Sequence, residues 1–129
     1  MRILAAAVLA LSLTGCATVQ NWIPSFWDDN QSRAIVDVRQ SVAQLDCNID
    51  HAPQVKRIKD HLEWFDLYSE SKGSRQQDVR KLIGPMKETV DDFYKRSIDK
   101  QGTKAYCEIK KKIMILQSEK SASAVLGRF

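Results

Sequence analysis

The stretch PQVKRIKDHLEWFDLYSESKG, residues 53–73, carries the pattern that decides the fold. Its apolar side chains recur every three or four residues, which places them on one side of an α-helix, and the charged residues fall on the other side. The members of this stripe are Val55, Ile58, Leu62, Phe65 and Tyr68. Pro53 suits a first helical turn, where its missing N–H is not needed, and Lys72-Gly73 is typical of a helix end. The stretch therefore predicts one amphipathic helix.

Three further segments repeat the helical period. Residues 30–46 and 74–98 each begin near a capping-box spacing, in which a polar cap is followed three positions later by a glutamine. The two pairs are Asp28 with Gln31 and Ser74 with Gln77. Thr103 is the expected cap of the last segment. Its expected buried stripe comprises Ala105, Ile109, Ile113, Leu116, Ala122 and Val125.

Few residues interrupt these segments. The 129-residue chain holds five glycines and three prolines, which favours long helices. Gly84-Pro85 lies inside the third segment and predicts a kink or break there, because proline removes a backbone hydrogen bond and clashes with the preceding turn. Four amphipathic helices with short links predict one all-α domain, an antiparallel four-helix bundle with its third helix kinked at Gly84-Pro85.

Composition and motifs argue against several classes of function. Basic and acidic residues, 20 and 16 of them, are interspersed, so the net charge of +4 does not favour nucleic acid. No H-E-x-x-H, G-x-S-x-G or G-x-x-x-x-G-K-[ST] motif occurs. His61-x-Glu63 is reminiscent of the zinc deaminases, but their P-C-x-x-C partner is missing. We therefore expect no enzyme activity, catalytic residue, metal, cofactor or small-molecule substrate.

The amino terminus has the form of an export signal. Met1-Arg2 gives a positive start, and residues 3–13 form an apolar run that is too short to span a bilayer, which takes about 20 residues. Leu13-Thr14-Gly15-Cys16 then resembles the lipobox of bacterial lipoproteins. That resemblance implies cleavage after residue 15 and acyl chains on Cys16 that anchor the protein in a membrane. The alternatives are an ordinary secretory signal that happens to contain Cys16 and an uncleaved anchor.

The lipoprotein resemblance also implies an address and a domain order. Residue 17 is Ala rather than Asp, which under the Gram-negative sorting rule implies the outer membrane, with the domain facing the periplasm. We expect a signal peptide at 1–15, a lipidated tether at 16–28 and the bundle at 29–129. The tether holds Trp22, Phe26 and Trp27. These side chains either lie on lipid headgroups or pack on the base of the bundle.

The other two cysteines are expected to pair. Cys47 ends the first predicted helix and Cys107 begins the fourth, so an up-down-up-down bundle brings both to the same pole. An exported protein lies in an oxidising compartment, and lipid on Cys16 leaves an even pair. Two free thiols are the alternative. A metal site is disfavoured because neither cysteine has a C-x-x-C partner.

Two surface features have both a functional and a structural interpretation. Trp64 and Leu67 fall off the stripe of their helix, so they either widen the core contact or form an exposed patch for a partner helix. Together with Gly84 and Pro85 they are our candidates for lining a partner groove. The basic run at 110–112 suits anionic headgroups or glycans, or else is a solvated face balanced by nearby acidic residues.

The arrangement of Cys16, Cys47 and Cys107 around four helices resembles that of the type II secretion pilotins of the PulS/OutS kind. The resemblance is topological, and it implies a non-enzymatic outer-membrane lipoprotein whose bundle binds another cell-envelope protein. The alternative function is a structural or membrane-active lipoprotein, including a phage-encoded one that acts in lysis or superinfection exclusion.

Overall fold

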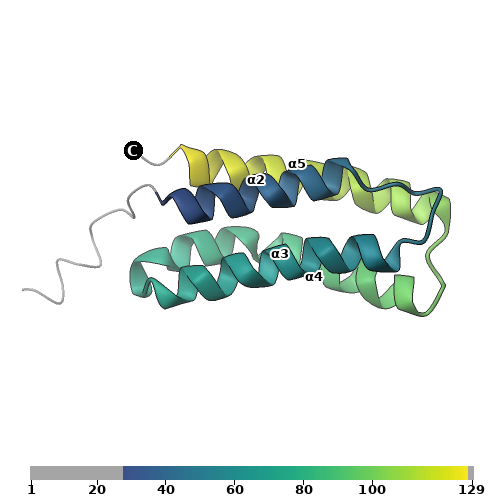
Figure 1. The fold of residues 1–129 in the computed structure, drawn as a ribbon, viewed down its shortest axis with the longest axis horizontal. Helices are drawn as coiled ribbons and strands as arrows, with labels where there is room; N and C mark the ends of the chain where they lie inside the picture. Colours follow the sequence, from purple (N-terminus) through teal and green to yellow (C-terminus); the bar gives the residue numbers. More distant parts are fainter. Residues whose placement is uncertain (1–27, 128–129) are drawn as a thin grey trace, which may run out of the picture.

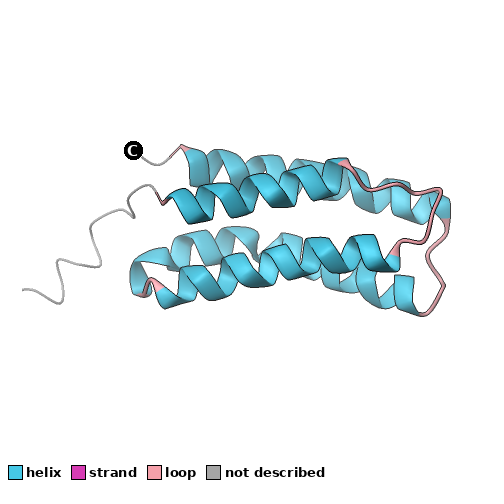
Figure 2. Ribbon diagram, viewed as in Figure 1, coloured by secondary structure: helices cyan, strands magenta, loops and turns pink. Residues whose placement is uncertain are grey.

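The apolar stripes become helices close to where the sequence predicts them. In a computed structural model, which describes residues 28–127, the helices are α2 (Asp29–Ala43), α3 (Ala52–Ser71), α4 (Gln77–Ile98) and α5 (Lys104–Leu126). A short 3₁₀ turn, η1 (Ser74–Gln76), precedes α4. No strand occurs in the described range, and loops are confined to the two ends of the molecule (Figures 1 and 2). The all-α four-helix bundle is confirmed.

Each long helix packs against two neighbours and lies diagonal to the third. α2 contacts α3 and α5, α4 also contacts α3 and α5, and the backbones of the diagonal pairs α2–α4 and α3–α5 do not approach within 8 Å. Figure 1 shows the start of α2, the end of α5 and the α3–α4 turn at one end, which we call the N-terminal pole. The α2–α3 and α4–α5 loops lie at the opposite end, which we call the disulfide pole. The bundle therefore has four sides, each bounded by two helices.

Two clusters of apolar side chains make up most of the core. One cluster of buried side chains includes Val38, Leu62 and Phe93, and a second includes Ile35, Phe65 and Val79. The stripe predicted in residues 53–73 is correct for its first four members, all of which are at most 1% exposed. The apolar stripe on which the fold prediction rests is thus the side of α3 that packs into the core.

The stripe predicted for α5 is wrong over the first half of the helix. Ile109, Ile113 and Leu116 are 59%, 39% and 68% exposed, whereas Met114 is fully buried. The buried side of the helix consists of Cys107, Met114, Ser118, Ser121, Ala122 and Val125. Apolar residues occur on two sides of α5, and the bundle uses the side with the smaller residues and the disulfide. The prediction was correct only for Ala122 and Val125.

Helix beginnings follow the predicted caps in part. Asp28 Oδ1 accepts hydrogen bonds from the backbone N–H groups of Asn30 and Gln31 at 3.0 Å, and Thr103 caps α5 through the N–H of Tyr106. Ser74 was expected to cap the third helix, but α4 follows η1 and has no side-chain cap.

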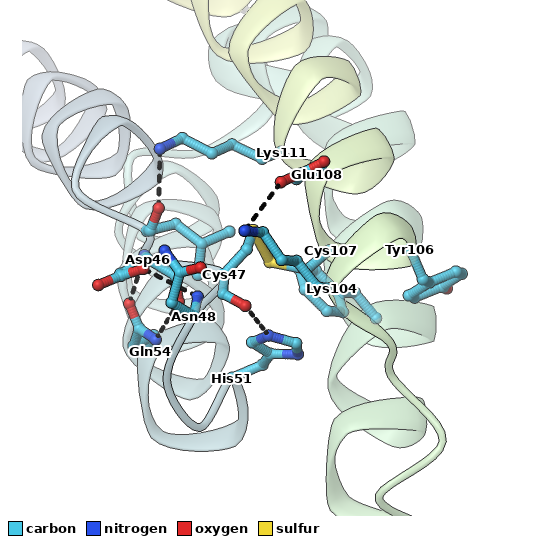
Figure 3. Close-up of a disulfide and its surroundings, with 12 residues drawn as sticks. Asp46, Cys47, Asn48, His51, Gln54, Lys104, Tyr106, Cys107, Glu108 and Lys111 are labelled. Carbon is cyan, nitrogen blue, oxygen red and sulfur yellow. Dashed lines mark hydrogen bonds and ion pairs between the residues drawn. A yellow bond between two sulfur atoms is a disulfide. The ribbon is translucent and has the colours of Figure 1, made fainter.

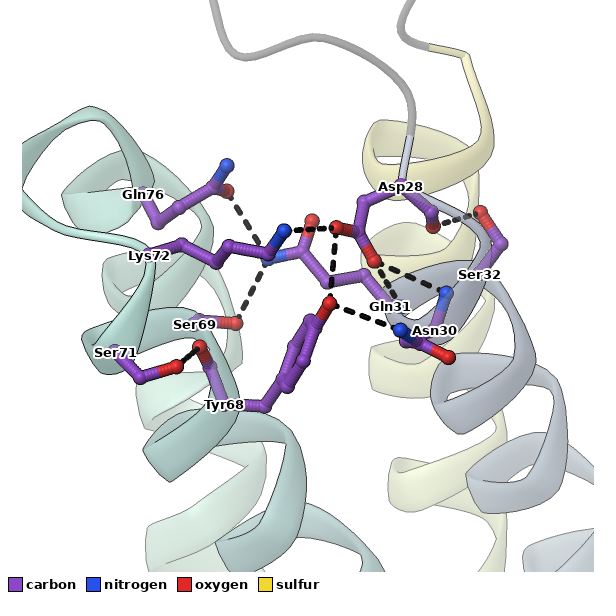
Figure 4. Close-up of polar contacts among 9 residues, drawn as sticks. All are labelled: Asp28, Asn30, Gln31, Ser32, Tyr68, Ser69, Ser71, Lys72 and Gln76. Carbon is purple, nitrogen blue, oxygen red and sulfur yellow. Dashed lines mark hydrogen bonds and ion pairs between the residues drawn. The ribbon is translucent and has the colours of Figure 1, made fainter.

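Gln31 does not complete a capping box either. Its side chain is buried, and Nε2 donates to Ser69 Oγ and to Gln76 Oε1, both at 3.0 Å (Figure 4). The amide therefore joins α2 to α3 and η1 instead of folding back on its own helix. A buried amide needs such partners, because an unsatisfied one costs about 1–3 kcal/mol.

The predicted interruption at Gly84-Pro85 does not end the helix. Helix α4 is one element from Gln77 to Ile98 with Pro85 inside it. The helix before it ends as predicted, with Lys72 as the C-cap and Gly73 at a φ of 90°, a backbone conformation that glycine adopts without steric cost.

The disulfide between Cys47 and Cys107 is confirmed. It joins the α2–α3 loop to the first turn of α5 across 60 residues of sequence, with the two Cα atoms 5.7 Å apart (Figure 3). Nearby, Lys111 Nζ donates to the carbonyl of Leu45 at 2.7 Å, and His51 Nε2 lies 3.2 Å from the carbonyl of Cys47. These contacts fix the loop between α2 and α3 against the start of α5.

Candidate functional site

The residues predicted to line a partner groove do not meet in one place. Trp64 and Leu67 are 48% and 66% exposed on α3, so they form a surface patch and do not widen the core. Trp64 lines a groove between α2 and α3, Gly84 lines one between α3 and α4, and Pro85 lines one between α4 and α5. They therefore lie on three different sides of the bundle. Cys16, Trp22, Phe26 and Trp27 lie outside the described residues.

Among the helices of the described residues, α5 carries the most exposed large apolar side chains. Ile109, Ile113 and Leu116 are spaced by four and three residues, so they share one side of the helix, and we call them the α5 stripe. Sequence reasoning assigned these same residues to the core. The signal that could have found them is that α5 is apolar on two sides, although a bundle helix needs only one such side for its core.

A groove beside the α5 stripe extends the surface onto α4. Its volume is about 260 Å³, and it is lined by Lys81, Leu82, Pro85, Met86, Gln117, Lys120 and Ser121. Gln117 Nε2 donates to the carbonyl of Pro85 at 3.3 Å and to Thr89 Oγ1 at 3.0 Å, while Thr89 Oγ1 donates to the same carbonyl. These bonds tie α5 to the proline turn of α4. Gln117 Oε1 is buried and has no hydrogen-bond partner among the described residues.

The charged side chains that line this groove are both basic. Lys81 and Lys120 line it, and Lys112 is exposed beside the α5 stripe. Within residues 28–127 none of these three lysines forms an ion pair. The other two lysines of the basic run are used internally: Lys110 pairs with Asp92 at 2.8 Å, and Lys111 bonds a backbone carbonyl. The basic run is thus not one uniform face.

A polar cluster lies on the same side of the bundle toward the disulfide pole. Lys110 Nζ and Tyr106 Oη both donate to Asp92 Oδ2 at 2.8 Å, and the Arg96 guanidinium lies 4.9 Å from the centre of the Tyr106 ring. The hydrogen bond from Lys110, followed by that from Tyr106, holds the pKa of Asp92 below its usual range. This carboxylate is therefore neutralised by its neighbours and leaves the groove itself basic.

The groove between α3 and α4 is larger, at about 510 Å³, but its charges bond one another. Asp66 accepts hydrogen bonds from Arg80 at 2.8 Å and from Lys87, and the Arg80 bond is the main reason why the pKa of Asp66 lies below its usual value. Lys59 pairs with Asp91 on the same side. The arrangement is that of an ion-pair network that stabilises α3 against α4.

Residues 28–127 contain neither a membrane-spanning helix nor a cluster of metal ligands. No helix in this range is long and apolar enough to cross a bilayer. No group of three or more His, Cys, Asp or Glu side chains in the same range is arranged to hold a metal ion.

Comparison of the chain with protein-family models, with curated proteins and with solved structures finds no match in any of the three.

Proposed function

We propose that this chain is a non-enzymatic lipoprotein, held at the outer membrane by acyl chains on Cys16, whose bundle binds another cell-envelope protein through α5. The address is supported by the sequence Leu13-Thr14-Gly15-Cys16, which follows the apolar run at 3–13. The binding role is supported by one observation above all, the exposure of the α5 stripe.

The spacing of the α5 stripe suits a helix as the partner segment. Side chains at i, i+4 and i+7 on one helix are the usual anchors for the apolar face of a second helix. Full burial of an aliphatic side chain contributes about 1.5–3 kcal/mol, and these three are already partly buried, so covering them adds about 3 kcal/mol in total. Association costs about 4–15 kcal/mol, so the stripe alone does not hold a partner.

The adjoining groove supplies the remaining contacts. Leu82 and Pro85 offer apolar surface on α4, and Lys81 and Lys120 offer positive charge without carboxylates paired to them. We propose that the partner helix has an apolar face with acidic residues along its edges. Opposite charges at the rim raise the association rate and fix the register of the two helices.

A site-specific cross-linker tests this proposal in intact cells. A photoreactive phenylalanine replaces Leu116 in the stripe or, as the control, Lys56 on α3, whose side chain is 55% exposed on the diagonal helix. We expect a light-dependent adduct of higher mass from position 116 only, mapped to an amphipathic helix with acidic edges.

The charge change Ile109→Glu adds a second measurement, because this residue is also exposed. It should abolish the adduct formed from position 116 while the melting temperature of the protein stays the same. No adduct at position 116, or the same adduct from position 56, refutes the assignment of the stripe as the binding surface.

A further inference from the structure

A second apolar patch lies on α3, the helix diagonal to α5. Trp64 and Leu67 are 48% and 66% exposed, and the Trp64 ring stacks on Tyr68 with ring centres 5.0 Å apart and planes 6° from parallel. We call Trp64 and Leu67 the α3 patch. Because the backbones of α3 and α5 do not approach within 8 Å, a partner helix on the α5 stripe leaves this patch uncovered.

The groove beside the α3 patch carries charges of both signs. It lies between α2 and α3, has a volume of about 320 Å³, and is lined in part by Trp64, Arg33 and Asp37. Arg33 and Asp37 are four residues apart on one side of α2, yet neither forms an ion pair within residues 28–127. The unpaired lysines around the α5 stripe, by contrast, all have the same sign. Two copies of the chain would repel each other through the α5 surface, whereas the α2–α3 side holds a charge and its complement.

The α3 patch and these two charges lie at the same level of the bundle. Asn30 Nδ2 donates to Tyr68 Oη at 2.9 Å, which relates the level of α3 to that of the antiparallel α2 (Figure 4). One turn along α3 from Tyr68, Trp64 is level with about residue 34 of α2. Trp64 therefore lies between the levels of Arg33 and Asp37, close to the midpoint between them.

We propose that the α2–α3 side binds a second copy of this chain, about a twofold axis that lies in the interface and crosses the helices at the level of residue 35. This axis sets α2 antiparallel to α2 of the second copy, so each Arg33 faces the Asp37 of the other copy. The same rotation brings the two Trp64 rings together near the axis, with one Leu67 on each side of them. One symmetric contact thus pairs the free charges and covers both patches.

The size of this side indicates a weak, reversible dimer. Helix α2 has 15 residues and is about 22 Å long, and two adjacent helices are about 20 Å wide, so the side measures about 440 Å². A standard interface buries about 800 Å² per partner. Because such a contact dissociates readily on dilution, it is best captured where the protein is made. The inference depends neither on lipidation nor on a partner at α5.

The first test uses the full-length chain in cells with a photoreactive phenylalanine at Leu67. We expect a light-dependent product of twice the monomer mass, in which the tryptic peptide 60–72 is joined to the same peptide of the second copy. Two copies of one peptide come only from two chains, so this product identifies the partner. Leu116, which is similarly exposed, is the control position and should not give this product.

Charge reversal tests the twofold arrangement. Arg33→Asp and Asp37→Arg should each reduce the product at least about tenfold when produced alone, because like charges then face each other at both pairs. When the two variants are produced together, the product should return, since two acidic residues on one copy then face two basic residues on the other. This recovery also shows that both variants fold. The matched control is Arg39→Asp, an exposed arginine about 240° around α2 from Arg33, and it should leave the product unchanged.

Every other outcome overturns the proposal. A product from position 67 that contains another protein or lipid contradicts a second copy, and so does the absence of any product. A product that the Arg33 and Asp37 variants leave unchanged, or one that does not return when they are combined, contradicts the twofold pairing. The adduct expected from position 116 with the partner of α5 depends on none of these results, so failure of this inference is distinguishable from failure of the proposed function.

Discussion

The side of α5 that faces the core can be tested with two substitutions only two residues apart. Met114 is fully buried, whereas Leu116 is 68% exposed. Truncating a buried methionine to alanine costs about 2–5 kcal/mol, because the lost contacts leave a cavity. Met114→Ala should therefore lower the free energy of unfolding by an amount in this range.

The expected cost at Leu116 follows from its exposure. Truncation to alanine removes three carbon atoms, worth about 2.4 kcal/mol when fully buried at about 0.8 kcal/mol each. Only about a third of this side chain is covered, so Leu116→Ala should cost at most about 0.8 kcal/mol. The better helix propensity of alanine reduces the cost further.

Urea unfolding followed by circular dichroism at 222 nm measures both values. The slope of the free energy against urea concentration should be the same in all three proteins, so the midpoints report stability directly. A loss of about 2 kcal/mol or more from Leu116→Ala, together with less than about 1 kcal/mol from Met114→Ala, would show that the other side of α5 faces the core. The binding surface proposed above would then not exist.

Three further predictions concern the disulfide, one ion pair of the bundle and the acylation of Cys16. Replacing Cys47 and Cys107 together by alanine should lower the free energy of unfolding by about 4 kcal/mol, since chain entropy predicts this for a closed loop of 60 residues; thermal unfolding with and without reductant checks it, and a loss below about 1 kcal/mol contradicts it. The pKa of Asp66 is lowered in the folded protein, so its ion pair with Arg80 contributes stability that is fully present above the unfolded value of 3.8 and is lost as pH falls through the lower folded value. Asp66→Asn should therefore cost about 1–2 kcal/mol at pH 7 and progressively less as the pH is lowered below 3.8, and a cost that stays constant over this acid range would be inconsistent with the linkage. Cys16→Ser should abolish labelling by a fatty-acid analogue, and unchanged labelling would rule out lipidation at this residue.

Much of the fold could be predicted from the sequence because the signals that define each helix come from residues close together in the chain. Period, caps and turn residues define each helix without knowledge of the others, and Asp28, Thr103 and Gly73 act as their residue types indicate. The disulfide was also predictable, since topology alone brings Cys47 and Cys107 to one pole. These inferences need no knowledge of how side chains interlock.

The errors concern choices that only packing decides. Helix α5 has two apolar sides, and which of them is buried depends on whether small residues such as Ser118 and Ser121 fit against the neighbouring helices. Gln31 was expected to bond its own helix, but Ser69 and Gln76 offer it buried partners from elsewhere in the chain. Neither choice is encoded in the spacing of residues along one helix.

The candidate site was less accessible to sequence reasoning than the fold. Exposure of Trp64 and Leu67 was anticipated as one interpretation of their off-stripe positions, but their separation from Pro85 was not. Each groove lies between two neighbouring helices, and the sequence alone does not say which helices are neighbours. It therefore could not show that Trp64 and Pro85 lie on different sides of the bundle. The α5 stripe was missed because the sequence prediction assigned its residues to the core of the bundle.

The disulfide also limits how far the protein lengthens under tension. A pull applied between Asp28 and a partner held on α5 is carried across the bridge, so the 60 residues it encloses cannot extend even if their helices melt. At about 3.4 Å per residue this removes about 200 Å of contour length from the loaded path. Only α2, the short link to Cys47 and the first turns of α5 bear the force. In the oxidised state, then, a pull between the proposed anchor and the proposed partner can lengthen only the short part of the chain that lies outside the bridge.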